Sequence, residues 1–444
     1  MQTVDSLLHA RWIIPVEPDD RVLSGHSLAI HEGRIVAIVP TTEASSRFRG
    51  LSEVHLDHHA LIPGLVNAHT HAAMSLLRGL ADDLPLMDWL QQHIWPAEGR
   101  WVSEEFVHDG SLLAIAEMLR GGITCFNDMY FFPEITARAV AAAGMRACLG
   151  MILIDFPTAY AGGSDEYLSK GLALHDEYRS HPLISTAFAP HAPYSVSDGP
   201  LGRVRMLADE LDVPIHMHVH ETAAEIEQSL EHSGARPLAR LNSLGMVSPA
   251  LLAVHMTQLT DAEIELCSAA GASVLHCPES NLKLASGFCP VQRLLDAGVN
   301  VALGTDGAAS NNDLDMFGEM RSAALLAKAV SGNASAVPAY QALRMATMNG
   351  ARALGLADAI GSLEVGKWAD LCAVRLDDFE STPVYHPVSQ LVYASGRHQV
   401  SDVWVAGEQL LKERVLTSLD EAEILARARQ WQLRISATDS EANA

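Results

Sequence analysis

Short apolar segments alternate with longer helical stretches from about residue 60 to residue 355, and this alternation constrains the fold more than any other feature. Each of eight segments has the length and composition of a buried strand. They are LIPGLVNAH (61–69), GITCFNDM (122–129), RACLGMILID (146–155), LISTAFAPH (183–191), VPIHMHVHE (213–221), LLAVHM (251–256), ASVLHCPE (272–279) and NVALGTDG (300–307). Eight strands with helices between them predict an α/β fold, a (β/α)8 barrel of the TIM type.

Both ends of the chain have a different pattern, made of short strands and turns. Residues 26–40 look like a hairpin with Glu32 and Gly33 at its turn, and strand-like runs return at 366–376 and 400–417. We therefore expect a small β-sandwich domain built from two separate segments, a metal-dependent barrel, and a C-terminal helix and tail. Their expected bounds are 1–58 with 359–417 for the small domain, 59–358 for the barrel, and 418–444 for the helix and tail. Ser418 and Glu421 have the spacing of a capping box at the start of that helix.

Charge and cysteine content limit the classes of partner. The formal net charge of −24 would repel a nucleic acid backbone, so we expect a small-molecule substrate and no nucleic acid. The six cysteines form no CxxC pair, which is typical of reduced thiols in a cytoplasmic enzyme. The first residues lack the features of a signal peptide, and no window is long enough to span a membrane. We expect a cytoplasmic protein without a membrane partner; the sequence leaves open whether it forms a homo-oligomer.

Side chains that can bind metal stand at the ends of several predicted strands. His69 and His71 are two residues apart and therefore share one face of a strand. His191, His255 and Asp306 end three further strands. Because active sites of such barrels lie at the carboxyl ends of the strands, these side chains should meet there. Imidazoles with one carboxylate suit a single Zn²⁺ per subunit, and Fe²⁺, Mn²⁺ or Ni²⁺ as alternatives.

The segment 213–221 offers three histidines, His216, His218 and His220, and strand parity does not choose among them. His218 and Glu221 form an HxxE pair, which could place a metal ligand beside a general acid/base. The remaining histidines of this segment would be core residues or would orient the ligands. A further group stands outside the strand ends and is expected to be solvated or structural: His31, His55, His58, His59 and His108.

Five motifs together resemble the amidohydrolase superfamily, and more closely its 5-methylthioadenosine/S-adenosylhomocysteine deaminases. These motifs are PGLVNAHTH (63–71), HMHVHET (216–222), LLAVH (251–255), LGTDGAASNND (303–313) and IGSLEVGKWADL (360–371). Each motif alone is a weak signal, but their order and spacing over nearly the whole chain are specific.

The resemblance implies a role for each residue. The implied metal ligands are His69, His71, His218 and Asp306. Glu221 is the implied acid/base, His255 would orient the attacking water, and Asp306 would accept a proton from it. No lysine follows His191 closely enough to suggest a carbamylated bridge, so one metal ion is expected rather than two.

The resemblance also implies a set of substrate contacts. His191 and Glu221 would contact the purine, Glu98 would bind the ribose hydroxyls, and Trp89 would pack near the 5′ substituent. Ser310 is expected to line the same pocket. For Trp89, ordinary helix packing is the alternative interpretation.

The implied reaction is hydrolytic deamination of the adenine ring of 5-methylthioadenosine, S-adenosylhomocysteine or adenosine, which gives the inosine-type product and ammonia. Residues 154–171 correspond to a stretch in which some relatives use arginine to bind the amino-acid carboxylate of S-adenosylhomocysteine. Here the stretch has no arginine and a single lysine, Lys170, which favours 5-methylthioadenosine. The alternatives are another deaminase of the superfamily, of guanine or triazine type, a cyclic amide hydrolase, or a non-catalytic barrel scaffold.

Overall fold

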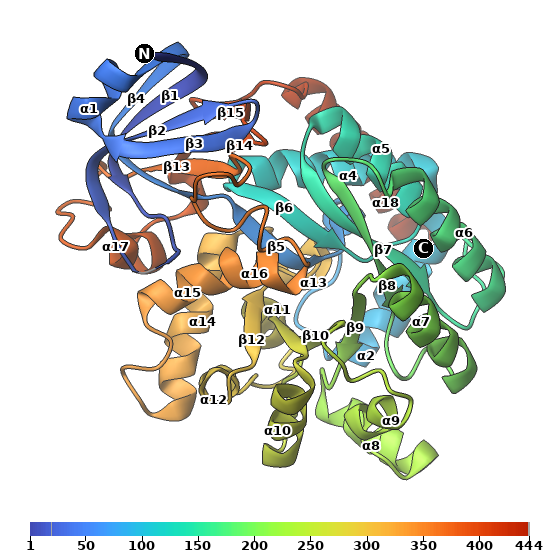
Figure 1. Ribbon diagram of the computed structural model, residues 1–444. Coiled ribbons are helices and arrows are strands. Elements are labelled where there is room, and N and C mark those ends of the chain that lie inside the picture. The colour runs from blue at the N-terminus through green and yellow to red at the C-terminus, as the bar shows by residue number, and fades with distance from the viewer. Residues whose placement is uncertain (19, 443–444) are drawn as a thin grey trace.

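Eight parallel strands form a nearly closed barrel in the computed structural model, which describes residues 1–18 and 20–442 (Figure 1). Each strand pairs with the next in chain order, from β5 to β12. The strands are β5 (Leu65–Thr70), β6 (Ile123–Asp128), β7 (Arg146–Leu153), β8 (Ile184–Pro190), β9 (Ile215–Val219), β10 (Leu251–His255), β11 (Ser273–His276) and β12 (Asn300–Leu303). The predicted fold class is confirmed, and all carboxyl ends lie at one rim.

The barrel closes between its first and last strands. The backbone N–H of Asp306 donates to the carbonyl of His69 at 3.0 Å. The Asn67 carboxamide spans the same seam, where it accepts from the N–H of Thr305 at 2.9 Å and donates to the Thr305 hydroxyl at 2.7 Å. Gly304 permits this approach, because a Cβ there would stand 2.7 Å from the backbone nitrogen of His69. Closure therefore brings Asp306 next to the His69 strand.

Helices cover the outside of the barrel and fill the connections between strands (Figure 1). Before the second strand come η1 (Ala72–Leu77), α2 (Leu86–Trp89), a π-helical turn η2 (Leu90–Ile94), α3 (Trp95–Trp101) and α4 (Glu104–Arg120). The others are α5 (Pro133–Ala143), α6 (Ser164–Tyr178), α7 (Asp198–Leu211), α8 (Ala223–Ser233), α9 (Pro237–Ser243), α10 (Asp261–Ala270), α11 (Pro278–Lys283), α12 (Val291–Asp296), α13 (Ala308–Asn311), α14 (Met316–Ser331), α15 (Ala339–Met345) and α16 (Met348–Ala353). Ser103 caps α4 by accepting from the N–H of Phe106, as its position before the helix favours.

The two ends of the chain form one eight-stranded mixed sheet beside the barrel (Figure 1). Its order is β16-β15-β14-β13-β4-β1-β2-β3. Its elements are β1 (Gln2–Ile13), β2 (Leu23–His31), β3 (Arg34–Pro40), α1 (Thr41–Arg47), β4 (Phe48–Pro63), β13 (Leu371–Arg375), α17 (Pro387–Tyr393), η3 (Arg397–Gln399), β14 (Val400–Val405), β15 (Glu408–Lys412) and β16 (Val415–Leu416). Glu32 and Gly33 both have positive φ at the β2–β3 turn, which is the backbone that such a two-residue hairpin requires.

A buried ion pair joins the barrel to the small sheet. The Arg146 guanidinium of β7 donates twice to Asp370, at 2.8 and 3.1 Å, and both side chains are at most 4% exposed. The same carboxylate accepts from the N–H of Ala406 at 2.8 Å. Both charges are thus compensated where the two sheets meet.

The C-terminal helix α18 (Glu421–Ala442) begins later than predicted. The predicted capping box is wrong, because the Asp420 carboxylate accepts from the N–H groups of Ala422 and Glu423 in place of Ser418. The Ser418 hydroxyl instead donates to the carbonyl of Ala143. The helix continues into the expected tail, and residues 443–444 lie outside the described residues.

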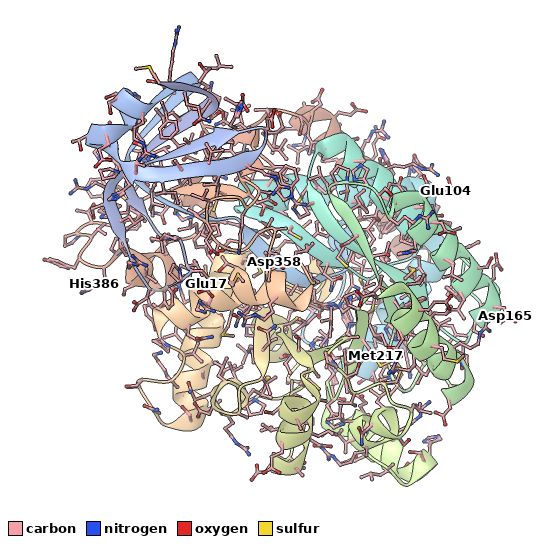
Figure 2. All side chains as sticks on the ribbon, in the orientation of Figure 1. Glu17, Glu104, Asp165, Met217, Asp358 and His386 are labelled. Atoms are coloured by element: carbon pink, nitrogen blue, oxygen red, sulfur yellow. The ribbon has the colours of Figure 1, made fainter. Side chains whose placement is uncertain are left out.

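Most of the buried side chains of the interior are apolar, and Figure 2 shows how the side chains are distributed over the ribbon. Glu104, Asp165 and His386 stand at the periphery, whereas Met217 lies buried in the barrel. All six cysteines are buried and unpaired. Among the described residues, none of the helices combines the length and the apolar character that a membrane crossing needs.

Candidate metal centre and substrate pocket

Four side chains from three strand ends converge at the carboxyl rim of the barrel. His69 lies on β5 and His71 directly follows it, His218 lies on β9, and Asp306 follows β12. One ligand atom from each lies within 4.8 Å of the others. Asp306 has a φ of 61°, a left-handed conformation that is uncommon outside glycine and is found at functional sites. This backbone conformation places the Asp306 carboxylate next to the three histidines.

The distances between these atoms are short. Nε2 of His69 lies 3.2 Å from Oδ1 of Asp306, and Nε2 of His71 lies 3.1 Å from the same oxygen. Nε2 of His218 lies 3.2 Å from Nε2 of His69. Three imidazole nitrogens and one carboxylate oxygen thus face a common point.

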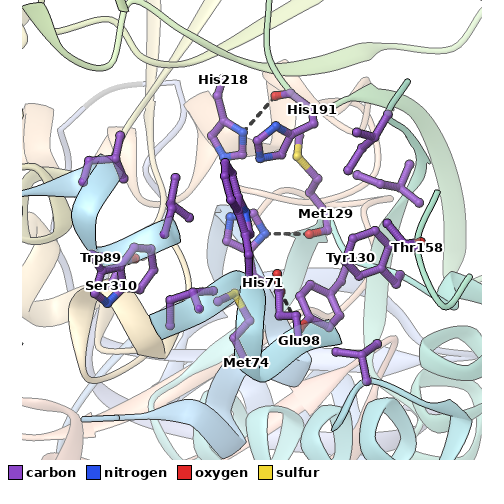
Figure 3. A pocket seen from close by; sticks show the side chains of 18 of the residues that line it. His71, Met74, Trp89, Glu98, Met129, Tyr130, Thr158, His191, His218 and Ser310 are labelled. Carbon is purple, nitrogen blue, oxygen red and sulfur yellow. Dashed lines mark hydrogen bonds between the residues drawn. The ribbon is translucent and has the colours of Figure 1, made fainter. Parts of the chain in front are cut away.

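Hydrogen bonds on the other ring nitrogens show that these groups fit a divalent cation. Nδ1 of His71 donates to the carbonyl of Met129 at 2.6 Å, and Nδ1 of His218 donates to the carbonyl of His191 at 2.9 Å (Figure 3). Because a carbonyl only accepts, the Nε2 atom of each of these rings carries a lone pair when the ring is neutral. Lone pairs aimed at one another and at a carboxylate repel unless a cation lies between them. Imidazoles oriented in this way by their second nitrogen are typical of zinc sites.

The Asp306 carboxylate is held by several donors. Its Oδ2 accepts from the hydroxyl of Ser280 at 2.6 Å and from that of Ser310 at 2.9 Å. Burial alone would raise the pKa of Asp306, but His69 and His71 outweigh it and hold this pKa well below its ordinary value. The carboxylate therefore stays ionised.

Glu221 stands beside this cluster with the opposite behaviour. Its side chain is 5% exposed. Burial, with Asp306 and Glu225 nearby, raises the pKa of Glu221 well above its ordinary value, so the group can carry a proton at neutral pH. The Glu225 carboxylate accepts from the backbone N–H of Glu221 at 2.7 Å and from that of His220 at 3.1 Å. Glu225 thereby fixes the backbone that presents Glu221.

His255 and His216 complete the polar floor of the site. Asn281 donates its amide N–H to Nδ1 of His255 at 2.9 Å, which fixes the orientation of that ring. His255 has a φ of 74°, so the end of β10 is also a left-handed residue. Burial lowers the pKa of His255 to about 3, so the ring is neutral. Nε2 of His216 lies 2.8 Å from Nδ1 of His69 and orients that imidazole, while His220 accepts the N–H of Leu238.

A pocket opens directly above these groups, between the barrel rim and the segment that precedes α4 (Figure 3). Its lining includes Trp89, Glu98, His191, Glu221 and Ser310, which are all five of the predicted substrate contacts. It also includes His71, His218, His255 and Asp306. Among the described residues that line it, none is lysine or arginine.

Glu98 lies on α3 at one side of the pocket and accepts from the Tyr130 hydroxyl at 2.8 Å (Figure 3). Burial raises the pKa of Glu98 to about 7. On another wall, Nδ1 of His191 lies 2.9 Å from the Ser195 hydroxyl, and burial beside His71 and His69 lowers the pKa of His191 to about 4. The pocket therefore offers a neutral imidazole and a carboxyl group that titrates near neutrality.

Trp89 forms part of an apolar wall. Its indole N–H donates to the carbonyl of Ala81 at 3.1 Å, so the ring is fixed with its polar atom already satisfied. Met74 and Leu86 line the same pocket. Trp89 thus packs within its helical segment and also lines the pocket.

Sequence reasoning did not identify the residues that orient these groups. Each of these residues forms a hydrogen bond with a site residue: Tyr130 with Glu98, Ser280 with Asp306, Asn281 with His255, and Glu225 with the backbone N–H of Glu221. All four lie within four residues of the end of a predicted strand: Tyr130 follows the second, Glu225 the fifth, and Ser280 and Asn281 the seventh. That position alone does not distinguish a residue that orients a site group from its neighbours.

Comparison with known proteins gives one family match. The amidohydrolase family model matches residues 60–410.

Two related sequences are similar over nearly their full length. A 5-methylthioadenosine/S-adenosylhomocysteine deaminase from Teredinibacter turnerae is 54% identical, and the alignment covers 98% of each chain. A protein of the same name from Saccharophagus degradans is 52% identical over 98% of this chain and 97% of its own.

One solved structure has nearly the same fold. The crystal structure of an adenosine deaminase from Xanthomonas campestris with bound zinc has a TM-score of 0.97 and 57% sequence identity. The match covers 98% of this chain and 99% of that one.

Proposed function

This chain belongs to the amidohydrolase family, and we propose that it is a zinc-dependent deaminase of adenine nucleosides, with 5-methylthioadenosine as its preferred substrate. The reaction adds water to C6 of the adenine ring and releases ammonia, which leaves the inosine-type nucleoside. The observation that carries this proposal is the proton-bearing Glu221 beside three imidazoles and an ionised Asp306 on the floor of one pocket.

His69, His71, His218 and Asp306 would hold one zinc ion, the metal bound in the Xanthomonas deaminase structure. When bound, the ion supplies positive charge that polarises the attacking water and lowers its pKa. The ionised Asp306 accepts the proton that this water loses.

Glu221 donates its proton to the ring nitrogen next to C6. Burial raises the pKa of its carboxyl group and so favours the protonated form before the reaction. As water attacks C6, the ring nitrogen becomes more basic and takes the proton. Glu221 then takes up the proton of the new C6 hydroxyl as the C6 carbonyl forms and passes it to the departing amine, and the proton held by Asp306 restores Glu221. His255 is neutral, and Asn281 holds its ring through Nδ1. Its other ring nitrogen, Nε2, faces the region of C6 and orients the attacking water.

The substrate contacts follow from the lining of the pocket. Neutral His191 can hydrogen-bond a purine nitrogen without adding charge. Glu98, when ionised, accepts from both ribose hydroxyls, as a carboxylate with two oxygens can. Trp89 with Met74 and Leu86 offers an apolar surface to the 5′ group.

The absence of lysine and arginine among the described lining residues favours a methylthio group over homocysteine at the 5′ position. The α-carboxylate of S-adenosylhomocysteine would find no cationic partner there. Lys170 does not fill this role, because its Nζ pairs with Glu166 at 2.9 Å and bonds to the carbonyl of Tyr160. Leaving a charged group without a partner costs affinity.

The test is a substrate panel with the zinc-loaded protein. 5-Methylthioadenosine, S-adenosylhomocysteine, adenosine, guanine and a triazine are each incubated, and purine absorbance and ammonia are followed together. We expect ammonia release with 5-methylthioadenosine, with a lower kcat/KM for S-adenosylhomocysteine. Turnover of guanine or the triazine alone would instead support the rival deaminases. Asp306→Ala is the control for contaminating activity.

A further inference from the structure

We propose that the small sheet carries a second site for a divalent transition metal, formed by His9, Glu53 and His55. It would bind ions that prefer imidazole, such as Zn²⁺, Ni²⁺ or Cu²⁺. This site is separate from the barrel rim and does not rest on the proposed deaminase function.

The pairing of two distant strands brings the three side chains together. β1 and β4 run parallel, and His9 stands directly opposite His55. Glu53 precedes His55 by two residues and therefore points to the same face of β4. One ligand atom from each residue lies within 4.8 Å of the others.

The rings are already arranged side by side. The His9 and His55 imidazoles stack with their centroids 4.8 Å apart and their planes at 20°. Donor atoms around one tetrahedral zinc lie roughly 3.3 Å apart, given metal–nitrogen distances of about 2.0 Å. Because Glu53 and His55 are exposed, their side chains are free to rotate toward that spacing when an ion binds.

A hydrogen-bond chain fixes the tautomer of His9 that can bind a metal. The Ser27 hydroxyl donates to the hydroxyl of Thr41 at 3.1 Å, so its oxygen accepts from Nδ1–H of His9 at 2.7 Å. Nε2 of His9 therefore carries a lone pair. Histidine ligands in metal sites are oriented in the same way, by donating their other N–H to an oxygen.

The charge around His9 also suits a cation. Burial and the neighbouring His55 lower the pKa of His9, although Glu53 and Asp57 act in the opposite direction. The His9 ring is thus neutral at pH 7 and available as a ligand, while the two carboxylates supply negative charge.

The test is calorimetric titration of untagged, full-length protein whose catalytic centre has first been saturated with zinc and freed of excess metal. Titration with Zn²⁺ or Ni²⁺ should reveal one further equivalent, and Mg²⁺ should give no heat. Loss of one imidazole in His55→Ala should weaken this binding at least tenfold. His58→Ala, an exposed histidine on the same strand, is the matched control and should bind like the native protein.

Two further variants keep the test decisive. Ser27→Ala removes the acceptor of His9 and should weaken binding by about 10–100-fold, the effect typical of residues that orient a ligand. Glu53→Gln should also weaken it, and this exposed substitution leaves the sheet intact. Cu²⁺ bound at the site should show coupling to two nitrogens in its electron paramagnetic resonance spectrum.

The proposal is overturned if the native protein takes up no further equivalent. It is equally overturned if His9→Ala and His55→Ala, with native thermal unfolding, bind that equivalent as tightly as before. Deaminase turnover should be unchanged in every variant of this site. A failure of the metal-site proposal can therefore be distinguished from a failure of the proposed deaminase function.

Discussion

Oε2 of Glu221 lies 3.7 Å from Nε2 of His255, across the ends of the neighbouring strands β9 and β10. Burial acts on the two groups in opposite senses. It raises the pKa of Glu221 well above its ordinary value, which favours the protonated carboxyl group, and lowers the pKa of His255 to about 3, so that this imidazole is neutral at pH 7. A proton donor and a neutral imidazole therefore face the same substrate region, next to the ionised Asp306.

Glu221→Gln removes the proton donor and keeps the shape of the side chain. We expect kcat to fall by about 10²–10⁴-fold, the usual contribution of a general acid. The zinc content should stay at one ion per chain, because Glu221 is not among the four converging groups. Turnover and bound zinc are measured on the same preparation. Near-native turnover of this variant would show that another group protonates the ring.

Ser280→Ala removes a hydrogen bond of 2.6 Å to Oδ2 of Asp306. The carboxylate then loses one of the groups that orient it, and zinc affinity should fall by about 10–100-fold. Competition with a chromophoric chelator measures the affinity. Ser268→Ala is the matched control, because its hydroxyl bonds to the carbonyl of Ala297 and neither residue lines the substrate pocket. Equal zinc affinity in the two variants would contradict the role of Ser280.

Glu98 gives the enzyme a predicted pH dependence of substrate binding. Burial raises the pKa of Glu98 to about 7, so the carboxyl group is protonated below that pH and ionised above it. Only the ionised form accepts from both ribose hydroxyls, so KM should fall as the pH rises through 7.

Glu98→Gln tests this dependence. It should raise KM for the nucleoside by about tenfold or more, the value of a hydrogen bond to a charged group. It should also flatten the fall in KM between pH 6 and pH 8. Free adenine, which has no ribose, should show no such change. An unaltered pH profile of KM in the variant would exclude Glu98 as the ribose contact.

The Arg146–Asp370 pair predicts a large effect on stability. Asp370→Ala leaves a buried guanidinium without its partner, so the free energy of unfolding should fall by about 3–5 kcal/mol. Asp377→Ala breaks an exposed pair with Arg375 and should leave this free energy almost unchanged. Urea unfolding followed by circular dichroism compares the variants. Equal losses in both would mean that the buried pair contributes no more than a surface pair.

The positions of the site residues could be predicted because the carboxyl ends of parallel strands share one rim. His69 and His71 therefore meet Asp306, although more than 230 residues of sequence lie between these histidines and the aspartate. Parity could not choose among His216, His218 and His220. The structure separates them by their partners, since His216 orients His69, His218 faces Asp306 and His69, and His220 bonds to Leu238.

The remaining features depend on contacts that no local pattern encodes. The approach of Ser280 to Asp306 and of Tyr130 to Glu98 follows from how α11 and the segment after β6 lie over the rim. His55 was expected to be solvated or structural, and its pairing with His9 depends on the parallel register of β1 and β4. The start of α18 was missed because Asp420 competes with Ser418 as the cap, and both residue types favour that position.

The central claim is that His69, His71, His218 and Asp306 bind one catalytic zinc ion. Its most direct test is anomalous diffraction at the zinc edge from crystals of protein loaded with a single equivalent of zinc. We predict one strong peak bonded to three imidazole nitrogens and the carboxylate, and its loss together with activity in Asp306→Ala. An active, zinc-loaded protein without a peak among these four side chains would contradict the account.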